Sequence, residues 1–223
     1  MTDWSTWASV ATAAGTLVLA VATFASIRSA NRSARVSELA ARTAERSLLA
    51  AQRPLLVNSR FGEDPEQKVE FYEGAWHKLQ GGGAAFDVGD GVIHMSASLR
   101  NVGTGLAVLH GWVMAVGQQT ERVHPPLADF TQQVRDIYIA PGDVGFWLGA
   151  LRDPHAQIFP ALSEAIARHE MLTMYLLYGD FEGGQRVITQ FAMRWGNEMW
   201  RLVAGRHFGV DRPDPRHLDD DGN

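Results

Sequence analysis

An uncharged, apolar stretch between Ala8 and Ile27 constrains this chain more than any other part of its sequence, and it contains no proline. An α-helix rises about 1.5 Å per residue, so roughly 20 residues cross the hydrocarbon core of a bilayer, which is about 30 Å thick. The stretch therefore predicts a single membrane-spanning helix. A cleaved signal peptide and a buried helix of a soluble protein are the two competing interpretations.

The residues on both sides of this stretch favour a membrane span. Trp4 and Trp7 lie where an interfacial aromatic belt is expected, whereas Asp3 replaces the Lys or Arg that begins a signal peptide. Basic residues follow the stretch at once, at Arg28, Arg32, Arg35, Arg42 and Arg46. The positive-inside rule then predicts an inner (plasma) membrane protein with its N-terminus outside and its C-terminal domain in the cytoplasm.

One face of the predicted span carries only small residues, which let membrane helices approach closely. These residues are Ser9, Ala13, Thr16, Ala20 and Thr23. The helix-forming segment that follows continues this face as a heptad seam that includes Ala30, Ala34, Ala41, Ala44 and Leu48. The pattern predicts self-association, with membrane lipid as the other partner. An Ala-rich span that does not dimerise, and a seam that packs on the chain's own domain, are the alternatives.

A second region begins at Arg53-Pro54, because proline cannot continue a helix. Short apolar runs separated by Gly- and Pro-rich turns predict strands, and one helix is expected within 154–170. The strands are expected at 55–61, 69–72, 76–79, 92–99, 106–116, 134–139, 144–151, 171–178, 186–194 and 199–204, with a loop at 81–83. The fold class is therefore mainly β: a transmembrane helix and helical stalk (1–53), an antiparallel β-sandwich with one helix (54–205) and a flexible acidic tail (206–223).

Three segments resemble those of a known group of proteins. They are Leu99-Arg-Asn-Val-Gly-Thr-Gly-Leu-Ala107, a later Ala-Pro-Gly-Asp turn, and Leu-Leu-Tyr-Gly-Asp-Phe-Glu-Gly. The chain resembles uncharacterised bacterial single-pass membrane proteins in which a span and a helical stalk end in an Arg-Pro step and carry an immunoglobulin-like β-sandwich. The resemblance implies this fold and topology and implies no activity. From the residues alone, the glycines and Asn101 predict a tight turn.

The sequence contains little that predicts catalysis or metal binding. It has no cysteine, its eight histidines show no HxH, HxxxH or HExxH spacing, and GxSxG is absent. Three weak candidates remain. They are a His94–His110 pair on adjacent strands, a cation held by loop carboxylates at Asp87, Asp90 and Asp180, and a hydrolase site at Ser163-Glu164 with His169. We expect no catalytic, cofactor or metal site, and the net charge of −5 excludes general nucleic-acid binding by charge.

Four tryptophans, Trp112, Trp147, Trp195 and Trp200, fall on predicted strands and are expected in the core. Trp195 and Trp200, with Arg194 and Arg201 beside them, are alternatively a surface for a partner or for lipid headgroups. The leading hypothesis is a membrane-anchored, non-enzymatic scaffold or protein-interaction module that forms a homo-oligomer and binds a protein partner. A ligand-sensing membrane effector of the bacterial defence type is the alternative, and a membrane-bound hydrolase is a third.

Overall fold

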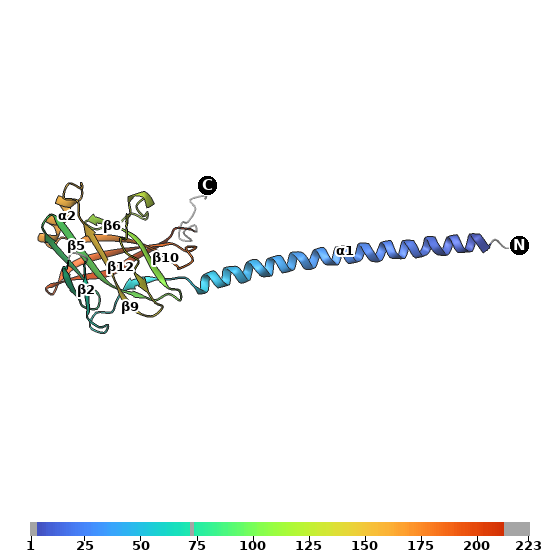
Figure 1. Cartoon of the computed structure of the whole chain (residues 1–223), viewed down its shortest axis with the longest axis horizontal. Coiled ribbons are helices and arrows are strands. Elements are labelled where there is room, and N and C mark those ends of the chain that lie inside the picture. Colours follow the sequence, from blue (N-terminus) through green and yellow to red (C-terminus); the bar gives the residue numbers. More distant parts are fainter. Residues whose placement is uncertain (1–3, 72–73, 212–223) are drawn as a thin grey trace, which may run out of the picture. The chain divides into compact units, whose positions relative to one another are not determined.

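The computed structural model describes residues 4–71 and 74–211, apart from the side chains of residues 4–6, 9 and 50. The chain divides into two compact units, Met1–Leu48 and Leu49–Asn223. The first consists of most of helix α1 (Trp4–Ala51), which Figure 1 shows as one unbroken ribbon. The second is a β-rich domain.

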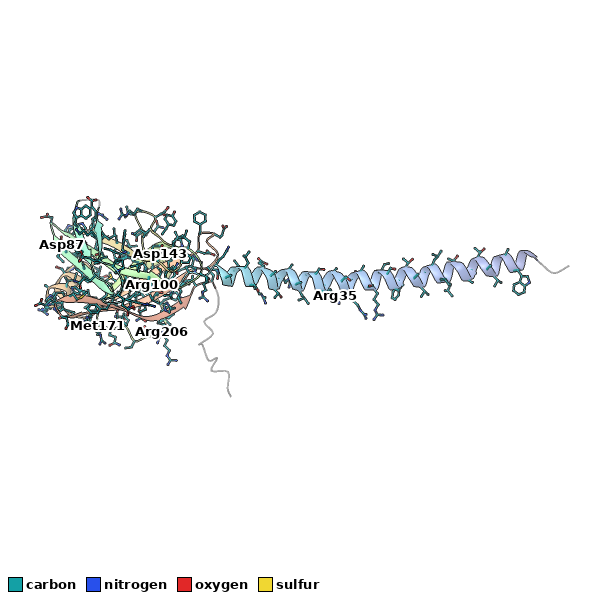
Figure 2. The ribbon with its side chains drawn as sticks, turned by 90° about the horizontal axis from the view of Figure 1, so that it is seen from below. Arg35, Asp87, Arg100, Asp143, Met171 and Arg206 are labelled. Carbon is teal, nitrogen blue, oxygen red and sulfur yellow. The ribbon has the colours of Figure 1, made fainter. Side chains whose placement is uncertain are left out.

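Helix α1 runs for 48 residues from the apolar stretch into the arginine-rich segment, as the sequence predicts. Its side chains, Arg35 among them, project outward along its length (Figure 2). Within it, Val10–Leu49 is long and apolar enough to cross a membrane, and none of its most apolar window is buried. The threonine hydroxyls of this stretch do not disturb the helix, because those of Thr12, Thr16 and Thr23 donate to carbonyls four residues earlier, at 2.8–2.9 Å.

Ten strands of the domain form one sheet in which every pairing is antiparallel. They are β1 (Leu56–Asn58), β4 (Gly83–Gly89), β5 (Val92–Asn101), β6 (Ala107–Val116), β7 (Thr131–Gln132), β8 (Tyr138–Ile139), β9 (Val144–Leu151), β10 (Leu172–Gly179), β11 (Val187–Gly196) and β12 (Met199–Gly209). The main order is β1-β5-β4-β12-β11-β10-β6-β7, with β9 on the free side of β5 and β8 beside β7 on β6. A separate hairpin joins β2 (Gln67–Glu70) and β3 (Trp76–Leu79).

The two ends of this sheet turn toward one another around a shared core. Trp112 of β6 and Trp147 of β9 belong to opposite ends of the strand order, yet their rings meet edge to face with centroids 5.6 Å apart. Helix α2 (Phe159–Ala167) buries Leu162 and Ala165 in the same core. Its Pro160 lies in the first turn, where a missing N–H costs no helical hydrogen bond. The fold is thus the predicted one, a mostly antiparallel β domain with one further α-helix.

Two strand predictions are wrong in detail. The predicted loop at 81–83 leads directly into β4, whose run of glycine and alanine has none of the alternation that indicates a strand. A Cβ on Gly83 would lie 2.9 Å from the carbonyl oxygen of Gln80 and 3.0 Å from Met199, so close packing explains this glycine. The predicted strand 134–139 forms only at β8, and β7 precedes it.

At its C-terminal end, β12 continues to Gly209, past the predicted strand end at 204 and into the first residues of the predicted tail. Residues 212–223 lie outside the described part of the chain.

Candidate functional site

A cleft of about 830 Å³ lies where the two ends of the sheet approach each other without pairing. Its walls come from the end of β2, from β6 and β7, from the segment after β7 and from β9. Phe71, Trp112 and Leu148 are at most 6% exposed and line it with apolar surface. The exposed side chains of Glu70, Arg135 and Arg152 also line the cleft. The cleft therefore combines buried apolar surface with exposed charge.

The indole pair beneath the cleft depends on a glycine. Gly149 of β9 lines the cleft, and a Cβ there would overlap Cζ2 of Trp147 and lie 3.1 Å from Cε2 of Trp112. Any other residue at position 149 would push the rings apart. The sequence predicted both tryptophans in the core, and they are 0% and 5% exposed. It gave no sign that Trp112 also forms part of a cleft.

Two glutamine side chains bind the free edge of β9. The Nε2 of Gln133 donates to the carbonyl of Leu148 at 2.7 Å, and the Nε2 of Gln67 donates to the carbonyl of Val144 at 3.4 Å. These amides occupy carbonyls on an edge that another strand would otherwise use. The Oε1 of Gln133 is buried and has no hydrogen-bond partner within the described part of the chain. Gln133 thus closes part of the edge, while its side-chain oxygen is buried.

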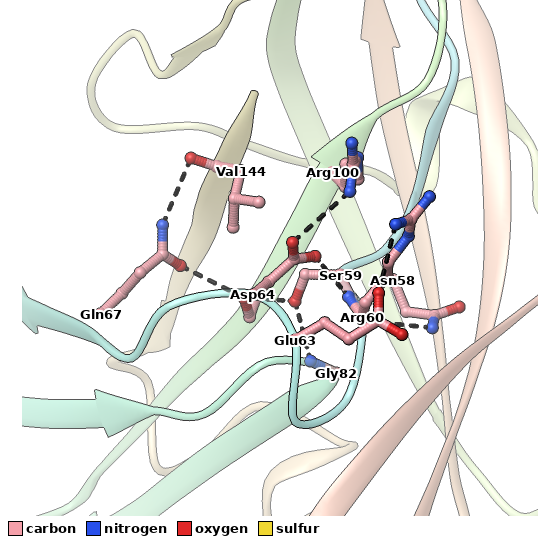
Figure 3. A network of polar contacts seen from close by, with 10 residues as sticks. Asn58, Ser59, Arg60, Glu63, Asp64, Gln67, Gly82, Arg100 and Val144 are labelled. Carbon is pink, nitrogen blue, oxygen red and sulfur yellow. Dashed lines mark hydrogen bonds and ion pairs between the residues drawn. The ribbon is translucent and has the colours of Figure 1, made fainter. Parts of the chain in front are cut away.

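A polar network holds the segment that carries Gln67 (Figure 3). The hydroxyls of Ser59 and Ser98 lie 2.6 Å apart, and Ser59 accepts from the backbone N–H of Gly82 at 2.8 Å. The hydroxyl of Ser98 donates to Oε1 of Gln67 at 3.2 Å, so both ends of this amide are engaged. Arg100 and Asp64 add a partly buried ion pair at 3.4 Å. These contacts fix Gln67 against β9.

Two histidines lie behind Phe71. The ring of Phe71 is 4.8 Å from that of His77 and 4.7 Å from that of His94. The Nδ1 of His77 is 2.6 Å from the hydroxyl of Ser96, and burial lowers the pKa of His77, with a smaller opposing effect of Asp87 and a further lowering by His94. This arrangement corrects the suggested His94–His110 pair.

His110 belongs to β6, which is not a neighbour of β5 in the sheet. The pKa of His110 is lowered by burial and by Arg186, against the opposing charges of Asp136 and Asp180. His110 therefore occupies a separate polar region from His77 and His94.

The Asn-Val-Gly-Thr-Gly segment holds the chain just after α1. The side chain of Asn101 is fully buried, and its Oδ1 accepts from the backbone N–H groups of Leu55 at 3.2 Å and Gly103 at 3.0 Å. Its Nδ2 donates to the carbonyls of Gly105 at 2.7 Å and Ile139 at 3.0 Å. One of these four bonds fastens residue 55 to the sheet, and the other three hold the turn and β8 around the same amide. We call this set of contacts the Asn101 clamp.

The glycines of the same turn are required by close approach. A Cβ on Gly105 would overlap the carbonyl of Gln52, and one on Gly103 would overlap the backbone at Arg53 and Leu55. The turn also binds the linker directly, since Thr104 N–H donates to the carbonyl of Arg53 at 3.1 Å. The predicted tight turn is present, and its partner is the Arg-Pro step.

The four residues of the predicted partner surface are divided between the two faces of the β11–β12 hairpin. Arg194 pairs with Arg201 and Trp195 with Trp200, so alternation places the arginines on one face and the tryptophans on the other. Trp200 is 5% exposed, whereas Trp195 is 38% exposed and stacks on His169 with ring centroids 3.9 Å apart. The guanidinium of Arg201 lies 4.4 Å from the ring centre of Phe61.

Of the predicted self-association residues, those with described side chains are exposed on α1. They are Ala13, Thr16, Ala20, Thr23, Ala30, Ala34, Ala41, Ala44 and Leu48; the side chain of Ser9 lies outside the described residues. Self-association through them stays a prediction.

Residues of the candidate cation and hydrolase sites make structural contacts within the domain. Asp180 Oδ1 accepts from the N–H groups of Gly184 at 2.8 Å and Gln185 at 3.2 Å, which is turn capping. No cluster of three or more His, Cys, Asp or Glu side chains that would suit a metal ion occurs in residues 4–71 and 74–211 with described side chains. His169 is occupied by its stack on Trp195, and Glu164 pairs with Arg168 at 2.6 Å.

Searches against models of protein families, curated proteins and solved structures found no match to this chain. The structure by itself supports an N-terminal apolar helix followed by a sheet-rich domain.

Proposed function

We propose that this chain is a membrane-anchored, non-enzymatic binding module. Helix α1 anchors it in the inner membrane with the N-terminus outside, and the β domain presents the cleft in the cytoplasm. The observation that carries the proposal is the exposure of the aliphatic side chains of α1, where Leu17, Val18 and Leu19 are 67–68% exposed. Residues of this kind favour insertion by about 0.3–0.6 kcal/mol each at the centre of a membrane helix.

Self-association through the small-residue face belongs to the same proposal. The hydroxyls of Thr16 and Thr23 donate within their own helix, so the face stays compatible with lipid and with a close helix contact. The homo-oligomer would present several β domains to a protein partner, as a scaffold does. The exposed residues Arg194 and Trp195 lie on opposite faces of the β11–β12 hairpin, and each face is a separate candidate for the surface that receives the partner.

The family resemblance agrees with this proposal. An apolar helix, an Arg-Pro step and a mostly antiparallel β domain occur here in the same order as in the uncharacterised membrane proteins with an immunoglobulin-like domain. We keep the immunoglobulin-like relationship as part of the proposal.

The cleft favours a second candidate, a ligand-sensing membrane effector. Pockets of about 300–1,000 Å³ with an apolar lining and a few polar groups are typical of small-molecule sites. In that case the domain would bind a ligand, and repacking of the thin alanine seam would disturb the membrane. Overexpression tests this candidate: a growth defect that disappears when α1 residues 8–27 are replaced by an inert span supports it, and unimpaired growth contradicts it.

Topology can be tested with single cysteines, because the chain has none of its own. A membrane-impermeant maleimide should label Thr2→Cys in intact cells and should label Glu182→Cys, in the exposed turn after β10, only after lysis. Carbonate washing should leave the chain in the membrane pellet. Labelling of Glu182→Cys in intact cells, or recovery of the chain in the wash, would contradict the proposed anchor or its orientation.

Self-association can be tested by crosslinking in native membranes. Gly15→Leu and Ala20→Leu place bulk on or beside the small-residue face and should reduce crosslinked oligomers. Val18→Leu is the matched control, since it adds a methylene to the same helix away from that face. Unchanged crosslinking in the two bulky variants would remove the oligomer from the proposal.

A further inference from the structure

We infer that Arg28, Arg32 and Arg35 of α1 form a binding surface for the phosphate groups of anionic lipids. We call these three residues the arginine face. The inference rests on the proposed anchoring of α1 in a membrane, and it names the class of lipid that the anchor selects. Three observations carry it: the arginines share one side of the helix, they have no partner among the described residues, and they lie at the depth of lipid headgroups.

The three arginines lie on one side of α1. An α-helix turns by about 100° per residue, so their spacing of four and then three residues places them within about 60° of one another. All three side chains are exposed, and Figure 2 shows Arg35 projecting from the ribbon. The seam alanines Ala30 and Ala34 each come two residues after an arginine, which is more than half a turn. A second helix packed on the seam would therefore leave the arginine face open.

No neutralising group accompanies the arginine face. The sequence has no Asp or Glu between Trp4 and Ser37, so the charged side chains in this part of the helix are all positive. The ion pair described on α1 lies further along, where Arg42 pairs with Glu38 at 2.5 Å. The three guanidiniums of the arginine face make no hydrogen bond or ion pair with the described residues. Each keeps five N–H donors in a planar fork that matches two oxygens of a phosphate.

The position of the arginine face along α1 brings it to the lipid headgroups. Arg28 directly follows the apolar stretch, and Arg35 lies about 10 Å further along the helix axis. The polar region of a bilayer adds about 5–7 Å beyond each side of the hydrocarbon core. Helical side chains lean toward the helix N-terminus, which here is the membrane side, and long arginine side chains extend this reach. All three guanidiniums can therefore contact phosphates of one leaflet.

Arg42 and Arg46 provide a contrast on the same side of the helix. They lie about 21 and 27 Å beyond Arg28 along the axis, which is past the headgroup region. Arg42 is also neutralised by Glu38. A soluble anion would have access to Arg46 as well as to the arginine face, whereas a lipid phosphate reaches only the arginine face. The two sets of arginines therefore distinguish a lipid from a soluble ligand.

Electron paramagnetic resonance of spin-labelled lipids tests the inference on the full chain in phosphatidylcholine vesicles. Trace phosphatidylglycerol and phosphatidylcholine with the same labelled acyl chain are compared, and the motionally restricted fraction gives the affinity of each lipid for the protein surface. We expect about a fivefold preference for phosphatidylglycerol in the leaflet that faces the arginines, the equivalent of about 1 kcal/mol. Averaged over both leaflets this is about threefold, and it should shrink in about 1 M salt because salt screens exposed charges.

Variants assign the preference to the arginine face. The triple variant Arg28→Gln, Arg32→Gln and Arg35→Gln should bind both lipids equally, whereas Arg42→Gln with Arg46→Gln should keep the full preference. The same triple change to lysine keeps the charge and should retain a preference, which separates loss of charge from any change in the helix. Inorganic phosphate added at constant ionic strength should displace neither lipid. Circular dichroism of each variant shows whether α1 is still helical.

Equal restriction of the two lipids by the unmodified chain, an equal loss of preference in the Arg42 and Arg46 variant, or displacement by inorganic phosphate would overturn the inference. Equal loss in the glutamine and lysine triple variants would also overturn it. Restriction of neither lipid would show that α1 does not enter the bilayer, and would remove the membrane anchor itself. A chain that restricts both lipids equally keeps the anchor and loses only the arginine face, so the two failures are distinguishable.

Discussion

The Asn101 clamp makes the sharpest prediction about stability. Asn101→Ala removes four hydrogen bonds at once, two that Oδ1 accepts and two that Nδ2 donates. A typical protein hydrogen bond contributes about 1 kcal/mol net, and buried groups left without partners cost about 1–3 kcal/mol each. Some of the freed groups will reach water, so we expect a loss of about 3–5 kcal/mol.

This loss should be visible in thermal unfolding. For a domain of about 150–250 residues, 1 kcal/mol shifts the Tm by about 2–4 °C, so Asn101→Ala should lower the Tm by about 6–20 °C. Tryptophan fluorescence of the full chain in detergent suits the measurement, because Trp112 and Trp147 are buried in the same domain.

Asn101→Asp separates the clamp from simple loss of volume. The carboxylate keeps both acceptor contacts, and it then faces the carbonyl oxygens of Gly105 and Ile139 without a donor. It should therefore destabilise the domain about as much as alanine does at neutral pH. Asn58→Ala is a milder control. The Nδ2 of Asn58 donates to the carbonyl of the next residue at 3.3 Å, and its Oδ1 accepts from the N–H of Ala204. A Tm shift below about 2 °C for Asn101→Ala would refute the reasoning.

Three further changes probe the same domain. Gly105→Ala, whose Cβ would overlap the linker backbone, should destabilise it by several times more than Gly196→Ala, where nothing lies within 4 Å, and equal Tm values would contradict this. Tyr178→Phe leaves the buried N–H of Leu56 without its acceptor at 3.0 Å and should cost about 1–3 kcal/mol in urea unfolding; a smaller loss would mean that water replaces the hydroxyl. Burial lowers the pKa of His77, so at acidic pH the unfolded chain binds more protons than the folded chain does. The contribution of His77 to stability should therefore be full above about pH 6.5 and fall as the pH drops below it. His77→Asn should flatten that fall in a pH series of Tm values, and an unchanged slope would exclude His77 as its source.

Local patterns were sufficient to predict much of the fold. The uncharged stretch and the helix-forming segment after it produced one helix, and Pro54 marked its end, because these signals act within a few residues. β5 was predicted from its alternation. β4 was missed in part because Gly83, its first residue, is set by packing against Met199 and Gln80, which lie elsewhere in the sequence or outside the strand.

The cleft was beyond prediction from the sequence. Phe71, Trp112, Gln133 and Arg152 come from separate elements and share no motif or spacing. They meet only because the sheet turns so that β6 and β9 approach each other. The Asn-Val-Gly-Thr-Gly segment is an intermediate case: composition predicted its turn, and only the tertiary contact showed that it holds the linker.

Beyond its apolar stretch, α1 carries two surfaces that a partner could cover: the alanine seam and a set of exposed aliphatic side chains. At about 1.5 Å per residue its 48 residues extend for about 72 Å, more than twice the roughly 30 Å of a hydrocarbon core. Beyond Arg28, Val36 and Leu39 remain 66% and 63% exposed. Each lies two positions from a seam alanine, Ala34 or Ala41, and two positions turn a helix by about 200°, so they face away from the seam. A two-helix pair formed through the alanines would leave these aliphatic side chains in water. A small cyclic bundle with the alanines at its centre would also leave the opposite face of each helix pointing outward, so a test of self-association should also measure whether Val36 and Leu39 are covered.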